Sequence, residues 1–263
     1  MATYKFTDIE ETINPEDVDL KSFEPKTELQ SDIWDSDDRI NQIVRRKLLS
    51  IARDFIKGLD EIDEIDIEDV IFTGSLANYN WNEEHSDIDL HIVVDLKALS
   101  NNEKINKGYF DAIRKNWNER HEDISIFGYP IEMYVQDKNE PHTSSGIYSL
   151  LRDEWIKKPK KGDMEMSDED SIKDKVAYYT NRVEELEDKM RKSRMQDDVL
   201  MDVYMECEKL MDEIKEMRKS GFADGGDEMN PGNLTFKSLR REGVIERITN
   251  MKRLSYDFMN SIN

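Results

Sequence analysis

Cysteine is almost absent from this sequence, with Cys207 as the single example among 263 residues. An internal disulfide is therefore excluded, and the chain suits a reducing compartment. Long apolar runs are also missing, since none approaches the roughly 18 to 20 residues that span a membrane. The opening MATYKFTDIEET lacks a basic region followed by an apolar one, so we expect no secretion signal and take the cytoplasm as the default location.

Positive charge is scarce as well, because 38 Lys and Arg residues face 59 Asp and Glu residues, for a net charge of -21. Such a balance repels a phosphate backbone and argues against general coating of DNA or RNA, while recognition of one nucleotide stays open. No two of the four histidines have the spacing of a zinc pair. Apolar residues make up 37% of the chain, yet clear periodic segments predict order over most of its length.

The periodic segments divide the chain into three parts. Residues 1–38 are predicted to form an extended acidic arm, and Trp34 is expected to attach this arm to the folded domain. Residues 39–162 predict a helix, two strands, a second helix marked by Ile105, Tyr109, Ile113 and Trp117, and two strands broken at Gly128-Tyr129-Pro130. Residues 163–263 predict a helical domain, with a hairpin over 171–220, a glycine-rich linker over 221–233 and one final helix over 234–262.

Candidate metal ligands lie on two of the predicted strands. Successive side chains of a strand alternate between faces, so Ile88, Leu90 and Ile92 point into the core while Asp87 and Asp89 share the opposite face with His91. In the later strand, Glu132 and Tyr134 lie opposite an apolar face. If the two strands are neighbours, three carboxylates converge, and such a cluster suits magnesium or manganese.

A candidate phosphate site precedes the carboxylate pair. Gly74 permits close backbone approach, and Ser75 is predicted to begin a short helix, SLANYNW, whose free N–H groups would meet a phosphate. Acidic residues occupy 59 of 263 positions, so Asp-x-Asp alone carries no weight and a solvated acidic face is the competing interpretation. The order of strand, Gly-Ser, carboxylate pair and third acid favours a site.

The stretch GSLANYNWNEEHSDIDLHIVV resembles the signature of the DNA polymerase beta-like nucleotidyltransferase superfamily, in which Gly-Ser precedes Asp-x-Asp and a third carboxylate follows. The resemblance covers Val70 to Val135, about a quarter of the chain. The longer sequence from TELQSDIWD through SLANYNW and SDIDLH is also similar to stand-alone predicted nucleotidyltransferases of large tailed bacteriophages. The resemblance implies an α+β fold, with a small mixed-sheet catalytic domain flanked by helices and followed by a helical C-terminal domain.

The resemblance also implies roles for individual residues. Gly74 and Ser75 would hold the phosphates of a nucleoside triphosphate, with ATP as the default. Asp87 and Asp89 would ligate two ions, Mg²⁺ or Mn²⁺, and Glu132 would ligate the ion that activates the acceptor hydroxyl. The sequence departs from the commonest pattern in using Glu at the third position, where Asp is more usual, which leaves the identity of the base open.

Several alternatives stay open at this point. The acceptor is a nucleic-acid 3′ end, a protein side chain, or another nucleotide or small molecule, and the basic face of the last helix is either an RNA contact or an ion-pair partner for the acidic body. A catalytically silent nucleotide-binding or protein-interaction module on the same fold is the second candidate function. A structural protein assembled through the hairpin is the third, although the hairpin's outer face is densely charged.

Overall fold

The computed structural model describes residues 12–58, 66–99, 102–142, 144–161, 166, 168–192, 196–223 and 226–261. The chain divides into two compact units. Met1–Ser22 and Met166–Asn263 form the helical unit, and Phe23–Glu165 form the sheet unit. Within the described part of the predicted arm, residues 12–22 lie in the helical unit and residues 23–38 lie in the sheet unit.

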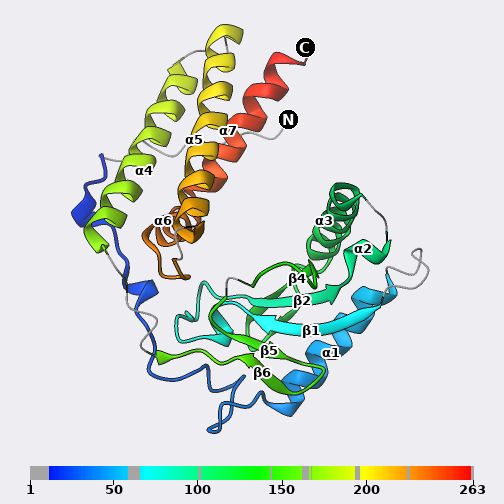
Figure 1. The fold of residues 1–263 in the computed structure, drawn as a ribbon. Coiled ribbons are helices and arrows are strands. Elements are labelled where there is room, and N and C mark those ends of the chain that lie inside the picture. The colour runs from blue at the N-terminus through cyan, green and yellow to red at the C-terminus, as the bar shows by residue number, and fades with distance from the viewer. Residues whose placement is uncertain are drawn as a thin grey trace. The chain divides into compact units, whose positions relative to one another are not determined.

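A mixed six-stranded sheet forms the centre of the sheet unit, in the order β3-β4-β2-β1-β5-β6 (Figure 1). The strands are β1 Ile67–Thr73, β2 Ile88–Val94, β3 Ser125–Ile126, β4 Tyr129–Asp137, β5 Ile147–Ser149 and β6 Glu154–Lys157. β2 pairs antiparallel with β1 and parallel with β4. A parallel pair requires a crossover connection, and here it carries the helices α2, Leu96–Leu99, and α3, Glu103–Arg120. With the helical unit, this sheet confirms the α+β class.

The two long helices of the sheet unit pack through different kinds of surface. α1, Gln42–Lys57, begins at Asn41, whose side chain accepts a hydrogen bond from the Ile43 N–H, and buries an apolar stripe that includes Leu48 and Phe55. α3 packs beside β4, where the Asn118 side-chain amide accepts a hydrogen bond from the Met133 N–H at 3.0 Å and donates one to the Met133 C=O at 3.3 Å. Asn118 thereby supplies the hydrogen bonds that a neighbouring strand would otherwise make.

The buried side of α3 differs from the predicted stripe. Ile105 and Tyr109 are 64% and 41% exposed, whereas Asn106 and Phe110 are buried. The Asn106 amide donates to the Leu96 carbonyl at 2.7 Å, which explains why a polar residue takes an inward position.

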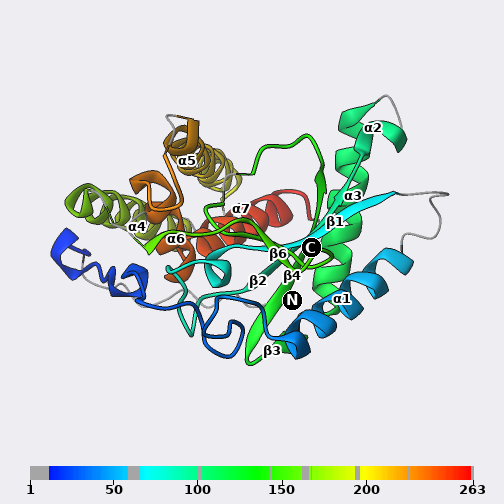
Figure 2. The ribbon, with the colours of Figure 1, turned by 60° about the horizontal axis from the view of Figure 1, so that its bottom comes forward.

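β3 and β4 form a tight hairpin at one edge of the sheet (Figure 2). The break falls at Phe127-Gly128, one residue earlier than predicted, so β4 already includes Tyr129 and Pro130. Both turn residues have positive φ, 53° and 86°, which matches the two-residue hairpin turns that follow the twist of antiparallel strands.

Trp34 fixes the segment before α1 to the sheet, as the sequence predicted. Its side chain is 2% exposed and stacks on Trp155 with ring centroids 4.5 Å apart. The indole N–H donates to the carbonyl of Leu76 at 2.7 Å. Because Leu76 lies next to Ser75, this contact supports the loop that carries the candidate phosphate site.

We expect Trp34→Phe to lower the free energy of unfolding by about 2 kcal/mol, because the buried Leu76 carbonyl loses its donor and the smaller ring leaves a void. Urea denaturation followed by far-UV circular dichroism measures the loss. Trp81→Phe is the matched control: the indole of Trp81 also donates to a carbonyl, that of Glu28 at 2.9 Å, but at an exposed position where water replaces it. Equal losses in both variants would contradict this role for Trp34.

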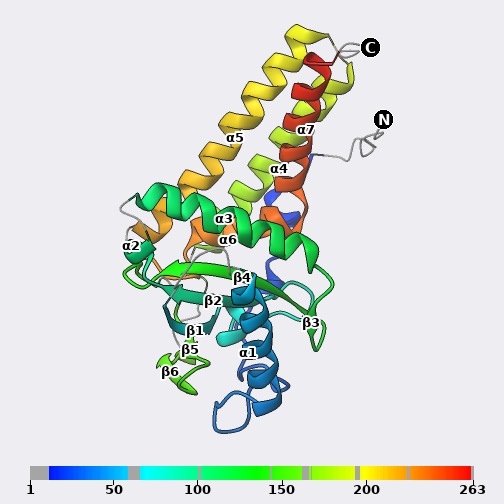
Figure 3. The same cartoon turned by 90° about the vertical axis from the view of Figure 1, so that its right-hand side faces the viewer.

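Four helices of the described chain make up most of the helical unit (Figures 1 and 3). They are α4 Glu169–Lys192, α5 Asp197–Ala223, α6 Pro231–Arg241 and α7 Val244–Met259. The residues of the first predicted seam are buried from Ile172 to Met190 in α4, and those of the second are buried from Leu200 to Ile214 in α5, where the last member, Met217, is half-buried. Residues 12–22 join this unit through Ile13, whose backbone N–H and C=O both bond the Asn181 amide at 2.9 Å.

The end of the chain differs from the predicted linker and single helix. α5 runs through Gly221 to Ala223, and α6 begins at Pro231, inside the range expected to be a linker. A break at Glu242-Gly243 then separates α6 from α7. Gly243 has φ of 74°, a left-handed conformation that ends a helix at low cost only for glycine.

Candidate functional site

The carboxylate pair lies where strand alternation places it. Ile88, Leu90 and Ile92 are fully buried, and between them Asp89 and His91 are half-buried on the other face. Asp87 immediately precedes β2 and is also half-buried. The predicted placement of both aspartates on one side of the strand is confirmed.

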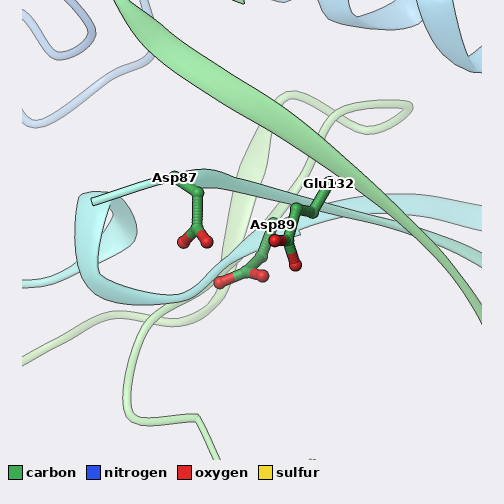
Figure 4. Close-up of side chains that lie close together, drawn as sticks. All are labelled: Asp87, Asp89 and Glu132. Atoms are coloured by element: carbon green, nitrogen blue, oxygen red, sulfur yellow. The ribbon is translucent and has the colours of Figure 1, made fainter. Parts of the chain in front are cut away.

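Glu132 reaches the same point because β4 is the parallel neighbour of β2. Asp89 pairs directly with Glu132 in the register of the two strands. One carboxylate oxygen from each of Asp87, Asp89 and Glu132 lies within 4.8 Å of the others, and Figure 4 shows the three side chains converging. We call these three residues the carboxylate triad.

Gly74 lies against the triad, and its lack of a side chain leaves room for the Asp89 carboxylate. It directly follows Thr73, which pairs with Asp89 across β1 and β2, and it has φ of 81°. A Cβ at this position would lie 1.9 Å from Oδ2 of Asp89 and 2.9 Å from Cγ. The Asp89 carboxylate therefore occupies space that only glycine leaves open, which adds a packing reason to the conformational one.

Ser75 begins one turn of 3-10 helix, Ser75–Ala77, and the chain is extended again at Asn78. The longer helix predicted over SLANYNW is therefore wrong. The Ser75 hydroxyl lies 2.8 Å from that of Ser86, which also accepts the N–H of Asn82 at 2.9 Å. Ser75 thus closes the loop between β1 and β2, whose two ends carry Gly74 and Asp87.

The residues after Ser75 are structural supports. Asn78 is fully buried, and its amide donates to the Ser145 hydroxyl at 2.6 Å. Tyr79 is 4% exposed beneath the Lys161 ammonium, and Trp81 bonds the segment before α1. These contacts show that Asn78, Tyr79 and Trp81 pack against neighbouring segments of the sheet unit.

A second polar group adjoins the triad along the same sheet face. The Tyr134 hydroxyl donates a hydrogen bond to Oε2 of Glu132. The His91 ring stacks on Tyr134 with centroids 4.7 Å apart, and Nδ1 of His91 bonds Oε1 of Gln136 at 2.8 Å. From α3, the Arg114 guanidinium carbon lies 4.9 Å from the centroid of the Tyr134 ring.

Burial controls the charge of this group. It lowers the pKa of His91 to about 4, so the imidazole is neutral near pH 7. Burial, followed by the negative charges of Asp89 and Glu132, raises the pKa of Tyr134 well above its ordinary value. The phenol therefore keeps its proton and acts as a donor to Glu132.

Sequence reasoning placed Tyr134 beside Glu132 but gave it no role. The signal was present, because residues two apart on a strand share a face and a phenol beside a carboxylate has a proton to donate. Arg114 had no such signal, since the apolar spacing of α3 pointed to a different buried side.

The triad fits a divalent metal ion. Three carboxylates within 4.8 Å of one another repel in the absence of a cation, and their oxygens are the ligands that Mg²⁺ and Mn²⁺ prefer. Half-burial strengthens both the repulsion and the gain from a bound ion, while leaving the carboxylates open to a ligand.

The mixed sheet thus brings two aspartates and a third acid together beside a Gly-Ser turn, an arrangement compatible with metal binding. Residues 52–155 match the family described as nucleotidyltransferase domain, about two-fifths of the chain. The match is consistent with the polymerase beta-like superfamily, and the matched stretch contains Gly74, Ser75 and the whole triad. No curated protein and no solved structure matches the chain. Within the described residues, no helix has the length and apolar character needed to cross a bilayer.

Proposed function

We propose that this protein transfers a nucleoside monophosphate from a nucleoside triphosphate to an acceptor hydroxyl, with release of pyrophosphate. The observation that carries the proposal is the convergence of the carboxylate triad within 4.8 Å inside a nucleotidyltransferase domain. Fold alone does not assign activity, whereas three acids held together against their own repulsion support a cation-dependent one.

Each part of the site has a role in this proposal. Asp87 and Asp89 would hold the Mg²⁺ or Mn²⁺ ions, and Glu132 would be a further ligand for the ion that serves the acceptor hydroxyl. A bound divalent ion supplies neutralisation of the phosphate charge that develops during transfer. Gly74 lets the backbone approach the phosphates, and Ser75 holds the loop in place through Ser86.

The proposed reaction is an in-line displacement at the α-phosphorus. The acceptor oxygen forms a bond to that phosphorus while the bond to the bridging oxygen of the β-phosphate breaks, and pyrophosphate leaves. Glu132 is the candidate for the group that takes up the hydroxyl proton. The chain contributes position and charge compensation, which supply most of the rate enhancement in phosphoryl transfer.

The contacts of α7 bear on the acceptor. Arg247 forms a bidentate pair with the buried Glu187, at 2.9 and 3.0 Å, and Lys252 pairs with Glu208 at 2.8 Å. These two basic residues are thus engaged with acids of α4 and α5, which favours the ion-pair interpretation over an RNA contact. We therefore rank a protein or small-molecule acceptor above a large RNA, with ATP as the default donor.

The test is to incubate the protein with each nucleoside triphosphate, Mg²⁺ or Mn²⁺ and a cell extract, and to analyse the products by mass spectrometry. We expect pyrophosphate release together with a nucleotide-sized mass on one class of acceptor, absent from an Asp87→Ala, Asp89→Ala control. Nucleotide binding without any transfer in either metal would instead favour the silent binding module. Concentration-dependent assembly that survives Asp87→Ala would support the structural alternative.

A further inference from the structure

Glu132 is the longest and most flexible member of the triad. A glutamate has one more rotatable bond than an aspartate, so fixing its side chain costs more rotamer entropy. A site that uses Glu at the third position therefore needs something to hold the carboxylate. The Tyr134 hydroxyl, which donates to Oε2 of Glu132, is placed to do so.

The Tyr134 ring is itself held by side chains from the two elements beside β4, which are β2 and α3. On the side of β2, its register partner His91 stacks against the ring, and Gln136 fixes His91 through Nδ1. On the side of α3, the Arg114 guanidinium lies over the same ring. Gln136 is in turn bonded to His142 through its amide nitrogen at 3.1 Å. Packing on both sides therefore fixes the orientation of the Tyr134 ring, and the ring in turn directs the hydroxyl toward Glu132.

We propose that Tyr134 is a positioning residue, which holds the Glu132 carboxylate in the orientation that binds the metal ion on the acceptor side. The inference rests on the proposed function and deepens it. The phenol proton occupies one lone pair of Oε2, so Oε1 and the remaining lone pairs stay available to the ion. Partners of this kind orient metal ligands, and their loss commonly reduces metal affinity or activity about 10- to 100-fold.

The test compares Tyr134→Phe with a matched control, Tyr148→Phe. Both tyrosines lie on strands of the same sheet, and the hydroxyl of each donates a hydrogen bond to a carboxylate. The Tyr148 hydroxyl donates to Oδ1 of Asp153 at 2.9 Å, and Asp153 is not a member of the triad. Mn²⁺ binding is measured on the full chain by electron paramagnetic resonance, without nucleotide. We expect Tyr134→Phe to weaken Mn²⁺ binding about 10- to 100-fold, and Tyr148→Phe to leave it at the wild-type value.

Two further measurements separate positioning from general loosening. If the hydroxyl acts only through Glu132, a Tyr134→Phe, Glu132→Gln double variant binds Mn²⁺ as Glu132→Gln does, with no added loss. In transfer assays, Tyr134→Phe lowers kcat by a similar factor and leaves the KM for the nucleoside triphosphate unchanged, because the nucleotide side of the site is intact.

Wild-type Mn²⁺ affinity and wild-type kcat in Tyr134→Phe would overturn the inference and leave the proposed function standing. An equal loss in Tyr148→Phe, or an additive loss in the double variant, would also overturn it, because the effect would then be a general one. No Mn²⁺ binding by the wild-type protein, or binding unaffected by Asp89→Asn, would overturn the proposed function together with the inference.

Discussion

Asp89→Asn, and separately Asp87→Asn, are expected to lower kcat for nucleotidyl transfer by roughly 1,000-fold or more, equivalent to about 4 kcal/mol of lost transition-state stabilisation. Asparagine keeps the shape of the side chain but offers a neutral oxygen in place of a charged one, so the site loses a hard anionic ligand. Initial rates of pyrophosphate release at saturating nucleotide measure the effect.

The same variants should be at least as stable as the wild-type protein in the absence of metal. Each removes one of three negative charges held within 4.8 Å, and relief of that repulsion favours the folded state. We expect their Tm in a chelator to equal or exceed the wild-type value, and we expect Mn²⁺ to raise the Tm of the wild-type protein alone. A loss of activity accompanied by a large fall in Tm would point to misfolding and contradict this account.

Asp95→Asn is the matched control, because Asp95 directly follows β2 as Asp87 directly precedes it. Asp95 pairs with Lys138 at 2.9 Å at the opposite end of the strand. Its replacement removes the same charge and should change kcat by less than about twofold, since surface pairs contribute little. Wild-type transfer rates in Asp89→Asn would place the chemistry elsewhere.

Gly74→Ala should reduce transfer at least about 100-fold and also destabilise the sheet unit. Alanine at φ of 81° and ψ of -165° is strained by on the order of 1–3 kcal/mol, and its Cβ would meet Oδ2 of Asp89 at 1.9 Å. The Asp89 carboxylate must then leave its place in the triad. Metal-dependent activity and urea denaturation are to be measured on the same preparation.

Gly128→Ala separates the cost of backbone strain from the cost of overlap with the Asp89 carboxylate. Gly128 has φ of 86°, close to that of Gly74, but a Cβ there would have no neighbour within 4 Å. It should show the backbone cost alone and keep its activity. In an Asp89→Ala background, Gly74→Ala should likewise show only the backbone cost, because the clashing carboxylate is gone. Equal effects of Gly74→Ala in both backgrounds would show that crowding of Asp89 is unimportant.

The triad was predictable because strand alternation is a strong constraint. Asp89 lies between Leu90 and Ile88, both fully buried, so its direction follows once the strand is recognised. Glu132 required one assumption, that the later strand is a neighbour of β2, and the parallel register of β2 and β4 satisfies it. The roles of Gly74 and Ser75 in nucleotide binding stay predictions.

The segment before α1 was harder to interpret because it has no regular period. Val18, Leu20, Phe23 and Trp34 are all buried, yet they sit in 3-10 turns and irregular chain that neither helical nor strand spacing reveals. In α3 the spacing was misleading, since Asn106 takes an inward position to bond a carbonyl and Ile105 faces solvent. The periodicity of apolar residues contains no information about a hydrogen bond such as that of Asn106, or about packing of irregular chain.

The parallel register of β2 and β4 also makes the site dependent on the order in which the chain is synthesised. Asp87 and Asp89 leave the ribosome well before Glu132, and α2 and α3 must be made before β4 can dock beside β2. A slip of one residue in that pairing would turn Glu132 and Tyr134 to the apolar face. The triad is therefore complete only in the finished sheet, and under the proposed function a nascent or mispaired chain would lack a complete metal site.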